Sequence, residues 1–171
     1  MNDVARTFVV GIGSDFGDDR LGPVVVERLV DRLVDRSPNV VVRRARSPLD
    51  LLDQLEKFER LHLVDACRCG GGAQAGTIRR TDWPAAELST IRFSGTHDVS
   101  LVAALHLAER LRTLPPRVTI WSVEAPAVAG PQNLLAPLSQ PVAVAAETLA
   151  DLIAAELKNP PVAVTEPIRH A

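Results

Sequence analysis

A short apolar run that breaks into a glycine-rich turn with two adjacent carboxylates constrains the fold of this chain most. Residues 8–12 are mostly β-branched or aromatic, which is typical of a buried strand. The turn that follows reads Gly13-Ser14-Asp15-Phe16-Gly17-Asp18-Asp19, and its glycines allow the chain to turn away at positive φ. Residues 24–34 have apolar side chains at helical spacing with charged ones between them, so we expect an amphipathic helix. Asp18 and Asp19 would then lie at or just before its N-terminus.

Two interpretations of this aspartate pair are open. Aspartate is a favoured N-cap residue and is stabilised by the helix dipole, so a single carboxylate would need no further role. A second adjacent carboxylate exceeds what a cap requires, and open α/β sheets place their ligand sites at the carboxyl ends of parallel strands. We therefore predict a functional role for Asp18 and Asp19, with helix capping as the alternative.

The rest of the chain alternates between strand and helix patterns. Further strands are expected at 39–45, 61–64, 77–81 and 118–123, and further helices at 49–58, 96–111 and 141–157. Strands joined through helices should be parallel. The pair Arg79 and Arg80 indicates that 77–81 is an exposed edge, and 83–94 has no clear period and is expected to be mostly loop.

These patterns predict the α/β class: a three-layer sandwich in which a twisted, mostly parallel sheet of about five strands has helices on both faces. The length of 171 residues fits one domain, which we expect to span 1–157. The proline-containing segment 158–171 lacks any period and is expected to be a disordered tail.

Charge and hydropathy exclude several classes of partner. A net charge of −2 predicts no strong attraction to nucleic acid or to an anionic membrane surface. The apolar runs are too short to span a membrane, and the N-terminus lacks the pattern of a signal peptide. We therefore expect a cytoplasmic monomer that binds neither nucleic acid nor membranes.

The two cysteines, Cys67 and Cys69, are separated by one residue. This spacing is poor geometry for a disulfide, and the chain has no other cysteine. We expect reduced thiols in a loop, with a site for a soft metal as the alternative.

A glycine turn between a strand and a helix is also typical of dinucleotide sites. The fingerprint requires a third glycine where this chain has Phe16. Arg43, Arg44 and Arg46 could suit a 2′-phosphate, but the carboxylates at the turn would repel the pyrophosphate from the helix N-terminus. An NADP-binding oxidoreductase therefore stays a minor alternative.

Clustered acids instead favour a divalent cation. Asp18 or Asp19 follows the first strand, Asp65 ends the third, and His97 lies where the helix at 96–111 begins, with Thr96 or Asp98 as its cap. All could meet at one edge of the sheet. Two carboxylates and an imidazole suit zinc, nickel or another first-row metal, with positions open for water or substrate.

Several motifs together resemble those of hydrogenase maturation endopeptidases over residues 6–156. They are Gly11-Ile12-Gly13, Gly17-Asp18-Asp19, Gly22-Pro23, Asp65-Ala66, Thr96-His97 and Val123-Glu124-Ala125-Pro126. The resemblance implies a cytoplasmic α/β enzyme that removes a C-terminal extension from the large-subunit precursor of a nickel-iron hydrogenase after nickel insertion. It implies that Asp19, Asp65 and His97 contact nickel carried by the substrate, or another divalent metal.

The expected chemistry is metal-assisted peptide hydrolysis with Asp19 or Asp18 as general base. The sequence departs from the family pattern at Ser14, where asparagine is usual, and at Arg20, where a small residue is usual. The turn is also one residue shorter, which could exchange the roles of the two aspartates. A non-catalytic metal-sensing module on the same fold is the alternative.

Overall fold

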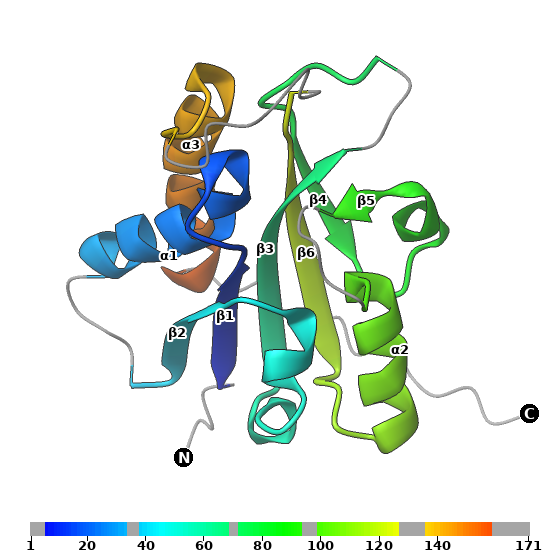
Figure 1. Ribbon diagram of the computed structural model, residues 1–171. Coiled ribbons are helices and arrows are strands. Elements are labelled where there is room, and N and C mark those ends of the chain that lie inside the picture. The colour runs from blue at the N-terminus through cyan, green and yellow to red at the C-terminus, as the bar shows by residue number, and fades with distance from the viewer. Residues whose placement is uncertain (1–5, 34–37, 69–71, 94–98, 127–135, 159–171) are drawn as a thin grey trace, which may run out of the picture.

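A six-stranded mixed sheet forms the centre of the protein in a computed structural model that describes residues 6–33, 38–68, 72–93, 99–126 and 136–158 (Figure 1). Its order is β2-β1-β3-β6-β4, and β5 pairs with β3. The strands are β1 (Thr7–Ile12), β2 (Val40–Ala45), β3 (Arg60–Arg68), β4 (Ile78–Asp82), β5 (Arg92–Phe93) and β6 (Arg117–Glu124). β2, β1, β3 and β6 are parallel, whereas β4 and β5 run antiparallel to their neighbours. The predicted mostly parallel sheet is confirmed.

Helices cover both faces of this sheet (Figure 1). α1 (Leu21–Arg32) and α3 (Gln140–Lys158) pack on one face, where β1, β3 and β6 contribute Val9, Val64 and Trp121 to the core. α2 (Leu101–Leu111) packs on the other face against Val10 and Leu63 of the same strands. Because side chains alternate along a strand, these apolar runs supply two separate cores. The three-layer sandwich predicted from the sequence is the observed fold.

Two glycines let α1 lie directly against the end of β1. A Cβ on Gly11 would be 2.0 Å from the carbonyl oxygen of Gly22, and a Cβ on Gly22 would be 2.2 Å from that of Ile12. No other residue fits at either position without moving the helix from the strand. This contact fixes where the chain between β1 and α1 must turn.

The structure corrects the expected helix at 49–58. Two short 3-10 helices, η2 (Pro48–Leu51) and η3 (Leu55–Lys57), occupy the segment. Ser47 caps η2, and Leu51 and Leu55 are buried. A continuous helix over so short a segment would add little stability, because the free energy lost in helix nucleation is about as large as that gained from a few hydrogen bonds. The two separate turns are enough to bury both leucines.

The other differences concern where elements begin. α1 starts at Leu21, three residues before the predicted start. α2 is capped by Ser100, whose Oγ accepts a hydrogen bond from Ala103 N at 3.2 Å. The predicted capping of α2 by Thr96 or Asp98 is therefore wrong, and 94–98 lie outside the described residues.

Two regions expected to be loops contain regular structure. η4 (Ala86–Thr90) and β5 lie within the segment expected to be loop, and Cys67 is fully buried in β3. The expected tail at 158–171 starts one residue too early, because Lys158 is the last residue of α3. Cys69 and residues 159–171 lie outside the described residues. No helix in the described ranges has the length and apolarity needed to cross a membrane.

Candidate functional site

A single 3-10 turn, η1 (Gly17–Arg20), carries the two acids between β1 and α1. The chain leaves β1 through Gly13, which has a φ of 149°. A Cβ at this position would lie 1.9 Å from the backbone oxygen of Asp19. Gly13 therefore lets η1 fold back against the carboxyl end of β1.

The two carboxylates of η1 have different partners, and neither caps a helix. The N-cap of α1 is Arg20, without a side-chain cap hydrogen bond. Asp18 Oδ1 accepts a hydrogen bond from the backbone N–H of Ser139, just before α3, at 2.7 Å. Asp19 Oδ2 accepts one from Ser14 N–H within its own turn, at 2.8 Å. The capping alternative is thus wrong, and the adjacent aspartates are distinguished.

Asp65 lies on β3 near the carboxyl end of β1 and is 1% exposed. Burial raises the pKa of this carboxyl well above its ordinary value, the negative charge of Asp19 raises it further, and a hydrogen bond with the Ala66 backbone lowers it. The influence of Asp19 on Asp65 indicates that the two side chains lie close together. The structure therefore brings together the acids that follow the first and third strands.

Each of these two carboxylates has one buried oxygen without a hydrogen-bond partner, Oδ1 of Asp19 and Oδ1 of Asp65. An unpaired anionic oxygen is costly to bury, and two neighbouring carboxylates also repel each other. A divalent cation would relieve both costs, because it is bound by carboxylate oxygens. The carboxylate oxygens of Asp19 and Asp65 therefore fit the predicted contact with a metal.

The third predicted ligand, His97, lies outside the described residues. Within the described ranges no group of three or more histidine, cysteine, aspartate or glutamate side chains could hold a metal. The structure therefore supplies two carboxylates, and the imidazole stays a prediction.

Two other histidines lie away from the acids, in the strand and helix where the sequence placed them. His62 is buried in β3, and its Nδ1 accepts a hydrogen bond from Trp121 Nε1 at 3.2 Å. Burial lowers the pKa of His62 to about 4. His106 is exposed on α2, with Nδ1 3.4 Å from a Glu109 carboxylate oxygen. Both positions agree with structural roles.

A buried ion pair beside the acids was not predicted. Glu124, at the end of β6, is 5% exposed and accepts a hydrogen bond from Arg79 of β4 at 3.1 Å. Its Oε2 is 4.0 Å from the Sγ of Cys67. β3 and β6 pair Asp65 with Ser122 and Cys67 with Glu124, so this polar row continues from the acid site. The sequence feature that could have predicted Glu124 is its position directly after an apolar strand, where a site residue is expected.

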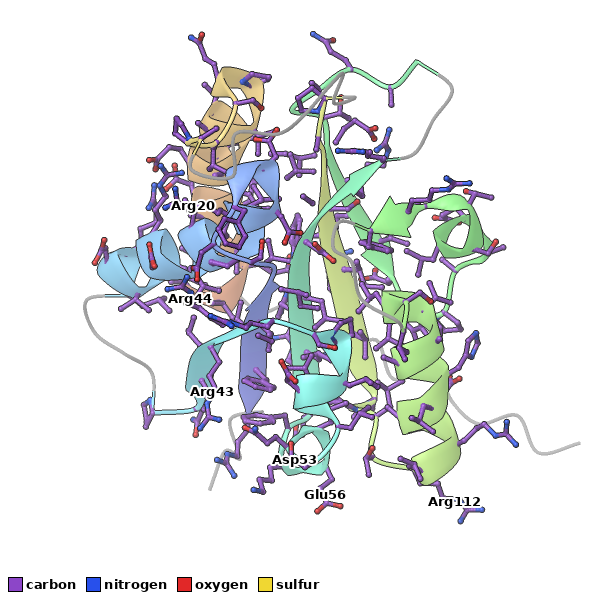
Figure 2. All side chains as sticks on the ribbon, in the orientation of Figure 1. Arg20, Arg43, Arg44, Asp53, Glu56 and Arg112 are labelled. Atoms are coloured by element: carbon purple, nitrogen blue, oxygen red, sulfur yellow. The ribbon has the colours of Figure 1, made fainter. Side chains whose placement is uncertain are left out.

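The arginines considered for a 2′-phosphate already have protein partners. Arg43 donates to Gln54 at 2.7 Å, and Arg44 donates to Asp15 and to Glu27 at 3.0 Å each. Figure 2 shows Arg43 and Arg44 along β2, on the same side of the molecule as Arg20. A cavity of about 280 Å³ beside Arg44 is also lined by Asp15. Asp15 and Glu27 balance the charge of Arg44, so the geometry does not favour a dinucleotide.

Comparison with solved structures gives the same fold. The [NiFe] hydrogenase maturation protease HycI from Thermococcus kodakarensis superposes with a TM-score of 0.68 at 24% identity, covering 92% of this chain and 96% of that one. The hydrogenase maturating endopeptidase HybD from E. coli gives 0.67 at 21%, with 90% and 92% covered. A hydrogenase 2 maturation peptidase from a Thaumarchaeota archaeon gives 0.60 at 23%, with 90% and 98% covered. No protein-family profile and no curated sequence matches the chain. The resemblance seen in the motifs is confirmed at the level of the fold.

Proposed function

We propose that this protein is an endopeptidase that removes the C-terminal extension of a nickel-iron hydrogenase large-subunit precursor after nickel insertion. One observation carries the proposal. The fold shared with hydrogenase maturation proteases presents two buried carboxylates, Asp19 and Asp65, each with an oxygen that lacks a partner. Such a pair recognises a divalent cation, and we take that cation to be the nickel of the substrate.

The residues of the site divide into holding and reacting groups. Ser14 N–H holds Asp19 through Oδ2, which leaves Oδ1 directed to the ligand. Asp65 and His97 complete the contact with the metal. Asp18 holds the segment before α3 through Ser139 and acts as a positioning residue. This division favours Asp19 over Asp18 as the general base.

In the proposed reaction Asp19 accepts the proton of the attacking water, and the amine of the departing peptide takes up a proton as the bond breaks. A bound divalent cation would supply polarisation of the scissile carbonyl or of the water. Asp65 opposes ionisation of the pair until a cation is present, because burial and Asp19 both raise its pKa.

The test is a processing assay read by mass spectrometry. The protein is incubated with a nickel-loaded large-subunit precursor and, separately, with the nickel-free precursor. We expect loss of a C-terminal peptide from the loaded form only. Asp19→Asn, Asp65→Asn and His97→Ala should each abolish processing. Asp15→Asn is the matched control, because Asp15 lies in the same turn with its carboxylate exposed and paired to Arg44.

The outcomes separate the alternatives. Binding to the loaded precursor without cleavage would support the non-catalytic metal-sensing module. If the protein neither binds nor cleaves the loaded precursor, the processing role is refuted. Full activity in any one of the three variants would remove that residue from the site.

A further inference from the structure

A pocket of about 420 Å³ opens beside Asp65 on the α2 face of the sheet. Its walls come from η4, β5 and the start of α2, which Figure 1 shows together on one side of β3. Most of its lining is apolar and consists of Leu88, Ile91, Phe93, Val99, Leu101 and Val102. Its volume lies in the range of sites that bind small molecules, roughly 300–1,000 Å³.

The two serines of this pocket form hydrogen bonds within the protein, and Asp65 and Arg92 are its two charged lining residues. Ser89 Oγ donates to the carbonyl of Ala86 at 2.7 Å, and Ser100 Oγ accepts from Ala103 N at 3.2 Å. Among the apolar lining residues, Leu88 and Leu101 are 1% and 2% exposed. A ligand in the pocket would therefore contact mainly hydrocarbon, and an apolar group gains most from such a site.

The position of Asp65 links this pocket to the proposed cleavage site. Its carboxylate is part of the pocket lining and also one of the two carboxylates of the acid pair. A peptide with its scissile bond at the acid pair would bring a neighbouring side chain directly to the pocket mouth. The pocket thus lies next to the proposed cleavage site.

We propose that this pocket binds a bulky apolar side chain next to the cleaved bond and so selects the precursor by sequence as well as by metal. The inference rests on the proposed function. Metal recognition by Asp19 and Asp65 cannot distinguish one nickel-bearing peptide from another. An apolar pocket can, since one methylene changes selectivity about 10- to 200-fold.

Binding is tested without catalysis by nuclear magnetic resonance of protein labelled at its Ile, Leu and Val methyl groups. The probe is N-acetyl-leucine amide, with the alanine and lysine amides for comparison. We expect the leucine amide to shift the methyl resonances of Leu88, Ile91 and Val102, and to bind at least tenfold more tightly than the alanine amide. No shift at these methyls, or a preference for the lysine amide, would overturn the proposal.

Two variants fill the pocket from different sides, Val102→Phe on α2 and Val99→Phe before it. Leu107→Phe is the matched control, because Leu107 lies on the same helix, is 41% exposed and does not line the pocket. Either filling variant that folds should weaken binding of the leucine amide at least tenfold, and the control should bind as wild type does. Unchanged binding in both filled variants would overturn the assignment.

A second readout separates this proposal from the processing role. Precursors with leucine next to the cut site should be processed fastest, those with alanine more slowly and those with aspartate slowest. In Val102→Phe the alanine precursor should be processed faster than the leucine precursor. Specific amide binding without processing of any precursor would refute the endopeptidase function and leave the pocket assignment intact. Processing without residue preference would refute the pocket's role in selection.

Discussion

Replacing Asp65 with asparagine should make the metal-free protein more stable while removing its response to metal. Wild-type protein buries an unpartnered oxygen on each of Asp19 and Asp65. Asparagine cannot ionise, so the site no longer holds two acids whose charges oppose each other, and its side chain offers an N–H donor to the neighbouring carboxylate. A buried unsatisfied group costs about 1–3 kcal/mol, so we expect a gain of about 2 kcal/mol in the free energy of unfolding in the presence of EDTA. In a chain of this size that gain raises Tm by roughly 4–8 °C.

A divalent cation should reverse the order of stability. At about 100 times its dissociation constant, Ni²⁺ or Zn²⁺ would stabilise wild-type protein by about 3 kcal/mol, because it binds only the folded state. Asp65→Asn loses a charged ligand and should gain little. In thermal unfolding, Asp65→Asn should therefore be the more stable protein with EDTA, and wild type the more stable one with metal.

Asp53→Asn is the control for this experiment. Asp53 is exposed and lies far from the acid pair, near the foot of the molecule as drawn in Figure 2. Its replacement should change neither the stability in EDTA nor the stabilisation by metal. Two results would refute the reasoning: an Asp65→Asn protein that is less stable than wild type in EDTA, or one that metal stabilises to the same extent.

Three further perturbations test the frame around the site. His62 has a pKa of about 4 when folded and an ordinary value of 6.5, so the unfolded chain takes up its proton first and stability falls as pH falls through this window. Between about pH 7.5 and pH 5 the free energy of unfolding should fall by about 2 kcal/mol, as measured by urea unfolding. This fall should be absent in His62→Asn. Gly22→Ala should lower the free energy of unfolding by about 2–3 kcal/mol, since its Cβ would meet the oxygen of Ile12 at 2.2 Å; unchanged urea unfolding would contradict the close strand–helix contact. Gly13→Ala should displace Asp19 and abolish the metal-induced rise in Tm while circular dichroism stays near wild type; a normal rise would show that Gly13 does not position the acid.

The fold was predictable because its signals are local. The apolar runs around Val9, Leu63 and Ile120 are each buried, and the helices between them force parallel pairing. Asp65 could be placed near the η1 acids for the same reason, because both follow parallel strands at one edge of the sheet.

Features that depend on distant partners were not predictable. β5 has only two residues, and it is a strand because Phe93 pairs with Cys67 of β3. The residues around Asp18 and Asp19 do not show which carboxylate holds a distant segment, and the contacts of Asp18 with Ser139 and of Asp19 with Ser14 distinguish them. Arg79 belongs to an edge strand as predicted, but the buried carboxylate with which it pairs is contributed by β6. Local periodicity carries no information about such pairings.

The hydrogen bond between Asp18 and Ser139 joins residues that are 121 positions apart, which has a consequence for synthesis of the chain. β1, β2 and β3 can pair once the chain up to Arg68 has left the ribosome, but Asp18 lacks its Ser139 contact until the residues before α3 follow. β4 likewise waits for β6, its partner strand in the sheet order. The nascent chain therefore presents Asp18 early and fixes it late, so a fragment that stops before Ser139 should lack a competent site.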